Sequence, residues 1–500
     1  MATEWVIRGV PPGLARDMWW LAVATEGPAG PGSATRPEWG AGARGRAGAL
    51  VALVALADWL FFGQAIGLSL ALFAAAVLGA VMLLQQGRAR LRPALMLLVA
   101  VLPVVEHVQA LSLAILGLGL MASVVWASAG PEALAGRVLR LLGDLPGRGI
   151  RDGIGLAAHA ARTGPMRDHR RLLRAWAFPL GGALILSALL IEANPVLGEV
   201  ALRLVRLDIG VKTVERLLFW TGAALAIWPL IAPLREARPP DLAVPTVKGP
   251  GAGSVARGLV VFNAILGVQT AMDAAYLWGG AALPQGMSAA EYAHRGAYPL
   301  LATALLAGAF ALAARPFAAE DRRLRGLLLL WLAQNVALTL SALLRLELYV
   351  DAFGLTYLRV HAAIWMALVA AGLGLTGWQV WRALPNRWLL VRTGALAAGT
   401  LYGCCFVNFA ALIATENLSR DRFDSTYVCD LGPTAAAAIA ASGRTGLRRY
   451  EFYADAWEPC PILAPQIDGW RDWGFRDWRV SRYLGTMPIT EGAREDPRGG

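Results

Sequence analysis

Long apolar segments recur along the chain and dominate its pattern of hydrophobic and polar positions. A hydrocarbon core of roughly 30 Å needs about 20 helical residues, and somewhat fewer suffice in a short hairpin. This length predicts eleven membrane spans, near residues 47–64, 66–84, 93–107, 109–129, 176–194, 217–233, 258–277, 298–314, 326–346, 358–381 and 393–415. We therefore expect an all-α fold, a polytopic transmembrane helical bundle of about eleven spans with a small C-terminal extramembrane domain.

The third and fourth spans are the least regular part of this pattern. Pro103, Glu106, His107 and Gln109 interrupt the apolar run at their junction. Two crossing helices and a re-entrant hairpin both fit such a junction, and the sequence leaves these two alternatives open.

Polar stretches divide the chain further. Residues 130–175 are basic and contain Leu134, Val138, Leu141 and Leu145 at helical spacing, which predicts a helix lying in the membrane interface. The expected divisions are a disordered cytoplasmic tail (1–46), a first transmembrane block (47–129), this basic cytoplasmic segment (130–175), a second transmembrane block (176–415) with an outer loop (278–297), and a C-terminal periplasmic domain (416–500).

Arginine gathers on alternate sides of the predicted spans. With the N-terminus inside, the inner segments carry 28 Lys and Arg residues and the short outer loops carry 5. The positive-inside rule then places the N-terminus in the cytoplasm and the C-terminus in the periplasm of a bacterial inner membrane. Because only 16% of the residues are charged and 57% are hydrophobic, the net charge of +11 indicates attraction to anionic lipid. The expected partner is the lipid bilayer, and no nucleic acid is expected.

Two of the four cysteines lie in the predicted periplasmic part. Cys429 and Cys460 are a candidate disulfide there, because that compartment is oxidising. Closing a loop of about 30 residues stabilises a small domain by roughly 3–4 kcal/mol in the chain-entropy model. Cys404 and Cys405 lie inside the last span and are expected to pack there.

Motifs for common cofactors and metals are missing from the sequence. There is no Walker lysine motif, no HExxH and no nucleophile elbow, and the five histidines lack metal-ligand spacing. We therefore expect no cofactor and no metal site.

Two aspartates fall inside predicted spans, where an ionisable group is costly and usually faces the bundle interior. Asp58 lies about 16 Å into the first span, near the midplane, and Asp273 lies within roughly 8 Å of the outer boundary. Two interpretations remain open for both, interhelical hydrogen bonding and contact with a ligand or coupling ion.

The loop after the seventh span gathers charged residues at the outer surface. Ser288 and Glu291 form a capping box for a short helix that also carries His294 and Arg295. Arg345 and Arg359 end and begin two later spans on the same side. Such a group can bind an anionic lipid or another envelope ligand, or move a proton. The alternative is a lattice of ion pairs that locks the helix ends together.

The same loop also carries a resemblance to a known family. The matching residues are Gln269, Asp273, Tyr276-Leu-Trp-Gly-Gly280, Leu283-Pro284, Glu291-Tyr-Ala-His-Arg-Gly296, Tyr298-Pro299, Arg345-Leu346, Tyr349, Gly354-Leu-Thr356, Arg359, Trp365, Leu56-Ala-Asp-Trp-Leu-Phe61, Ile413-Ala414 and Asn417-Leu418. These blocks resemble a bacterial membrane family known as domain of unknown function 4173. The resemblance implies a polytopic membrane fold and no particular activity.

Two functions follow from these residues. The first is a transporter or membrane sensor with an outer-facing polar site, in which Asp58 and Asp273 couple or face the ligand and Arg295, Arg345 and Arg359 contact an anion. The alternative is a membrane enzyme acting on a lipid-linked or envelope substrate at the periplasmic surface. In that enzyme His294 or Glu291 is the general base and the arginines hold phosphate.

Overall fold

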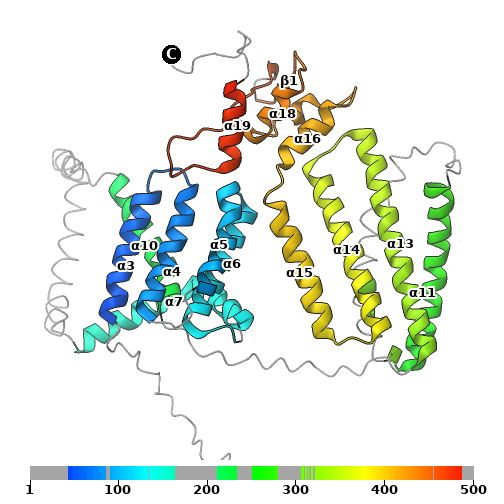
Figure 1. Cartoon of the computed structure of the whole chain (residues 1–500), viewed down its shortest axis with the longest axis horizontal. Helices are drawn as coiled ribbons and strands as arrows, with labels where there is room; N and C mark the ends of the chain where they lie inside the picture. Colours follow the sequence, from blue (N-terminus) through cyan, green and yellow to red (C-terminus); the bar gives the residue numbers. More distant parts are fainter. Residues whose placement is uncertain are drawn as a thin grey trace, which may run out of the picture.

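The structure is a computed structural model in which helices form almost all of the described secondary structure. The described residues are 43–85, 91–132, 134–163, 211–232, 251–279, parts of 306–318, 321–453 and 455–486. Figure 1 shows two groups of upright helices, with a C-terminal segment lying at one end of both.

The first bundle contains helices that are apolar on nearly every face. Its upright members are α3 (Ala43–Phe61), α4 (Leu68–Gln85), α5 (Leu91–Glu106), α6 (Ala110–Ala129) and α10 (Val211–Ile231). Leu53, Val77, Val104, Val124 and Ile231 form its buried core. Many other large apolar side chains of these helices are exposed, as expected of surfaces that face lipid.

The amphipathic helix α7 (Leu134–Thr163) lies across one end of this bundle (Figure 1). Leu141 of its apolar stripe is buried against Met121 and Val125 of α6. At Gly149 an added Cβ would lie 3.1 Å from the Leu225 Cα of α10, so glycine lets these two helices approach closely at this crossing. The apolar stripe expected to rest on the membrane surface therefore packs partly on the bundle itself.

The second bundle contains α11 (Ala252–Asp273), the π-helical turn η1 (Ala274–Trp278), α13 (Arg322–Phe353), α14 (Tyr357–Arg382) and α15 (Asn386–Cys404). Leu259, Leu266, Leu328, Leu332 and Leu373 lie in its core. A direct link joins the two bundles, because the Tyr402 hydroxyl donates a hydrogen bond of 2.9 Å to the Val99 carbonyl.

The last predicted span is not continuous. Residues 393–415 fall on α15 and on α16 (Phe409–Leu418), which are bent by 69° relative to each other. Asn408 causes a new helix to begin, because its side chain accepts a hydrogen bond of 3.1 Å from the Ala411 N–H. Its amide also donates to the Thr434 carbonyl at 2.8 Å, which directs α16 into the C-terminal segment.

The count of spans is smaller than expected in the described part of the chain. Five described helices are long and apolar enough to cross a membrane, and six if the bent pair α15–α16 is one span. The predicted span 176–194 and most of 298–314 lie outside the described residues. Helix α5 has only 16 residues, so the question of a re-entrant hairpin at α5 and α6 stays open.

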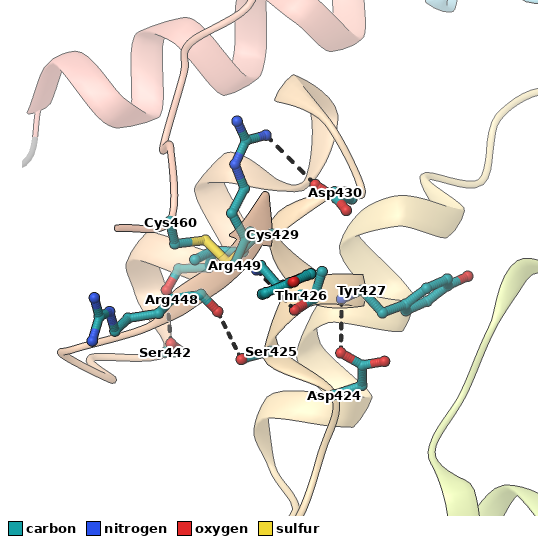
Figure 2. Close-up of a disulfide and its surroundings, with 12 residues drawn as sticks. Asp424, Ser425, Thr426, Tyr427, Cys429, Asp430, Ser442, Arg448, Arg449 and Cys460 are labelled. Atoms are coloured by element: carbon teal, nitrogen blue, oxygen red, sulfur yellow. Dashed lines mark hydrogen bonds and ion pairs between the residues drawn. A yellow bond between two sulfur atoms is a disulfide. The ribbon is translucent and has the colours of Figure 1, made fainter. Parts of the chain in front are cut away.

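The C-terminal segment consists of short elements joined by a disulfide. They are α17 (Ser425–Cys429), η2 (Pro433–Ala435), α18 (Ala436–Ala441), β1 (Arg448–Glu451), β2 (Ala456–Pro459) and α19 (Phe475–Thr486). Strands β1 and β2 pair antiparallel. Cys429 at the end of α17 is bonded to Cys460 just after β2, and Figure 2 shows the Ser425 hydroxyl donating to the Arg448 carbonyl beside this bond.

After the disulfide the chain returns to the first bundle as a strap, residues 470–473. The backbone N–H groups of Leu68 and Ser69 donate to the carbonyls of Trp473 and Arg471 at 3.0 and 3.1 Å. A Cβ on Gly67 would lie 2.4 Å from the Asp472 carbonyl carbon, so only glycine allows this approach. The strap thus ties the end of the chain to the loop between α3 and α4.

Candidate functional site

Three acidic side chains in apolar helices each meet an arginine from a distant element. These are Asp273 with Arg345, Asp58 with Arg216, and Glu106 with Arg476. A charge placed among apolar helices is costly unless it is paired, and such residues often mark functional positions. The three pairs are therefore the candidate sites of the described chain.

The Asp273 pair lies between α11 and α13. Arg345 donates from Nη2 to Asp273 Oδ1 at 2.5 Å, and Gln269, one turn earlier on α11, donates to the same oxygen at 2.9 Å. The Asp273 and Arg345 side chains are only 2% and 5% exposed. Water therefore screens this pair little, and its charges interact strongly.

The backbone changes form at this pair. Asp273 is the last residue of α11, and the next five residues form the π-helical turn η1, which ends at Trp278 just before Gly279. Single π-helical turns in α-helices occur frequently at functional sites. About three turns earlier on α11, the Asn263 amide donates across to the Leu327 carbonyl of α13 at 3.0 Å. Polar contacts therefore continue along the α11–α13 interface.

The Asp58 pair lies between α3 and α10 in the first bundle. Arg216 donates through Nε to Oδ1 at 2.8 Å and through Nη2 to Oδ2, and the Trp220 indole donates to Oδ1 at 2.9 Å. The arginine side chain is 51% exposed, and the Asp58 side chain is 12% exposed. This pair thus lies at an open edge of its bundle.

The Glu106–Arg476 pair joins the first bundle to α19. The sequence did not predict this pair. Arg476 donates to Glu106 Oε1 at 3.2 Å and to the Cys405 carbonyl, at the break between α15 and α16, at 2.8 Å. Arg479 donates to the same Glu106 oxygen at 3.3 Å, and His107 Nδ1 lies 3.3 Å from Asp477. The only available signal was that Glu106 and His107 interrupt an apolar run.

Arg359 has a different kind of partner. It donates from Nη1 to the carbonyls of Phe353, at 2.9 Å, and of Gly354, and its guanidinium lies 4.6 Å from the centre of the Tyr349 ring. Asn417 of α16 accepts from the Leu355 N–H at 2.6 Å and donates to the Leu355 carbonyl at 2.8 Å. These contacts fix the turn between α13 and α14.

A second contact holds the same turn. Arg420 donates to Glu416 at 2.8 Å and to Asp351 at 3.3 Å, which connects α16 with the end of α13. The hydrogen bond to Glu416 is the main cause that raises the pKa of the Arg420 guanidinium above its ordinary value. The Arg420 guanidinium therefore stays charged at physiological pH.

The expected outer cluster is only partly described. Glu291, His294 and Arg295 lie outside the described residues, with most of the loop 278–297. Of the arginines expected beside them, Arg345 pairs with Asp273 and Arg359 binds main-chain carbonyls. Among the described residues no three His, Cys, Asp or Glu side chains are grouped so as to hold a metal ion.

The cysteines differ in state. Cys429 and Cys460 form the disulfide of the C-terminal segment, with Cα atoms 5.4 Å apart. Cys404 and Cys405 are free, and the Cys405 side chain is buried at the end of α15. Its role at the Glu106 pair comes from its backbone carbonyl rather than from its thiol.

Comparison with known proteins identifies the family of this chain. The family model described as a domain of unknown function, DUF4153, matches residues 47–442. No curated protein and no solved structure matches the chain. The narrower resemblance to domain of unknown function 4173 gains no support from this match. With its apolar helices the protein is an integral membrane protein, and the chain belongs to the DUF4153 family.

Proposed function

We propose that the protein is a transporter of the bacterial inner membrane that couples the movement of a small anionic solute to a proton at Asp273. The observation that carries this proposal is the buried Asp273–Arg345 pair between α11 and α13. A buried ion pair loses much of its attraction to desolvation, so it is weak support for stability. Its position beside a π-helical turn favours a working role.

The pair offers a simple mechanism. While Asp273 is ionised, it holds the Arg345 guanidinium through a charge-assisted hydrogen bond. When Asp273 takes up a proton, the attraction is lost and Arg345 can bind an anion instead. A proton and an anion would then enter and leave the site together, and each would change the affinity for the other.

Orientation is part of this proposal. The excess of Lys and Arg in the segments between alternate spans supports a cytoplasmic N-terminus. The Cys429–Cys460 disulfide supports a periplasmic C-terminal segment, because disulfides persist in oxidising compartments.

A membrane sensor would use the same buried pair to detect its ligand, without net transport. The enzyme alternative is supported less, because a clamp for a surface substrate needs exposed arginines, and Arg345 is buried between two helices. Arg359 binds the carbonyls of the α13–α14 turn. We therefore place transport first.

The test uses the full chain in proteoliposomes that contain a pH-sensitive dye and experience an inward proton gradient. The probe is the anionic low-molecular-weight fraction of a bacterial cell extract, added outside. We expect this fraction to acidify the interior with the wild-type protein and to have no effect with Asp273→Asn. Asp351→Asn is the matched control, because Asp351 is an exposed aspartate of α13 and should leave the flux unchanged.

Two results would contradict the proposal. One is wild-type protein that moves no protons when the fraction is added. The other is Asp273→Asn protein that acidifies the interior as fast as wild type while folding normally.

A further inference from the structure

An apolar groove between α3 and α10 has no part in the proposed transport site. It encloses about 550 Å³ and is lined by Leu50, Val51, Val54 and Ala55 of α3 and by Leu217, Trp220, Thr221, Ala224 and Leu225 of α10. A second hollow of about 160 Å³ shares Leu50, Ala224 and Leu225 with it and is also lined by Asp152 and Gly153 of α7 and by Trp228. The two hollows thus adjoin each other along α3 and α10, and the second one reaches α7.

One end of this groove is cationic. Lys212, Arg216, Trp220 and Ala224 follow one another at a spacing of four residues, so they lie along one face of α10. Trp220 and Ala224 line the groove, which places Arg216 and Lys212 one and two turns beyond it. Asp58 balances one of these two positive charges.

Both cations can still bind an anion. Arg216 binds Asp58 through Nε and Nη2, so both protons of Nη1 remain for another acceptor, and half of the side chain is exposed. Lys212 is exposed and makes no ion pair with any residue in the described ranges. Glu215 lies three residues after Lys212 and therefore beside it on the helix surface, but these two residues form no ion pair in the described ranges.

We propose that this groove binds an anionic phospholipid of the surrounding membrane. An acyl chain lies along the apolar walls, and the headgroup phosphate accepts hydrogen bonds from Arg216 Nη1 and Lys212 Nζ. The groove is open to the lipid side, since Val51 and Leu217 on its two walls are more than half exposed. This inference does not depend on the transport proposal.

The test is native mass spectrometry of the full-length protein, purified in detergent and titrated with phosphatidylglycerol or with phosphatidylcholine. We expect phosphatidylglycerol to bind more tightly. Lys212→Gln should weaken its binding about five-fold, since one basic residue near an anionic lipid contributes about that factor. Ala55→Phe, which fills the groove and leaves both cations in place, should weaken both lipids.

Two control variants match the changes in size and in charge. Ala52→Phe changes another exposed alanine of α3 that does not line the groove, and Arg257→Gln removes an exposed cation from α11. Both should bind phosphatidylglycerol as the wild type does. The proposal is overturned if the wild type binds both lipids equally, or if Lys212→Gln leaves phosphatidylglycerol binding unchanged. Because Lys212 is exposed, the Lys212→Gln variant should fold and tests the lipid-binding proposal even if Ala55→Phe fails to fold.

Discussion

The Asp58 pair and the Asp273 pair use the same chemistry in two different surroundings. In both, an aspartate on one helix accepts from an arginine on another helix and from a second N–H donor, Trp220 or Gln269. The Arg216 side chain is half exposed at the edge of the first bundle, whereas Arg345 is buried in the second. The two pairs therefore differ in exposure: Asp58–Arg216 can contact lipid, whereas Asp273–Arg345 is buried between helices.

Our proposals use this difference to give the two aspartates different roles. A buried charge that loses its partner has no water to replace it, so breaking the Asp273–Arg345 pair leaves an uncompensated charge. The Asp58–Arg216 pair lies at the open edge of its bundle, where a lipid headgroup can approach Arg216 in our proposal. The comparison thus favours Asp273 for coupling and leaves Arg216 for a ligand at the surface.

The largest expected effect comes from removing the arginine of the buried pair. Arg345→Gln leaves Asp273 without its positive partner and should lower the free energy of unfolding by about 3–5 kcal/mol. Thermal unfolding in one detergent measures this loss. Arg322→Gln, at the exposed start of α13, is the control and should change little.

The double variant Asp273→Asn with Arg345→Gln sharpens this result. Because both charges are removed together, it should unfold at a higher temperature than Arg345→Gln alone. Equal instability of the single and double variants would mean that packing, and not charge, holds this interface together.

An intermediate effect is expected at the third pair. Glu106→Gln weakens the hydrogen bonds from Arg476 and Arg479 and should cost about 2 kcal/mol, as for a hydrogen bond to a charged group. Hydrogen exchange in α19 should increase, because this pair holds α19 against α5. Glu132→Gln, an exposed acidic residue before α7, should leave that exchange unchanged.

The smallest effect is expected for Asp58→Asn. The asparagine keeps an oxygen for Arg216 or Trp220, and the Arg216 guanidinium lies at the open edge of the bundle, where in our proposal a headgroup phosphate can pair with it. The unfolding temperature should therefore fall less than for Asp273→Asn under the same conditions. If Asp58→Asn destabilises the protein more, exposure does not rank the two pairs.

Much of the helical layout follows from local pattern. The apolar runs predicted α3, α4, α6 and α14 close to their observed bounds, because span length and helical periodicity are local properties, whereas α13 extends beyond its predicted span at both ends. The break at Cys405 was missed, since apolar residues continue through it. It depends on Asn408, whose partners include Thr434 in the C-terminal segment.

The sequence predicted parts of the site but not their partners. Asp58 and Asp273 stand out as charges in apolar runs, yet Arg216 and Arg345 lie 158 and 72 residues away. Glu106 and Arg476 are separated by 370 residues. Gly354 and Asn417, noted only for a family resemblance, and Arg359, predicted as an anion contact, prove to fix one turn between α13 and α14. Such long-range pairs depend on packing that no local pattern contains.

The most direct measurement compares Asp273→Asn with Asp58→Asn in the same proteoliposome assay, at equal amounts of folded protein. We predict that proton entry driven by the anionic extract fraction is abolished by Asp273→Asn and retained by Asp58→Asn. Loss of flux in Asp58→Asn with normal flux in Asp273→Asn would contradict the assignment of coupling to the buried pair.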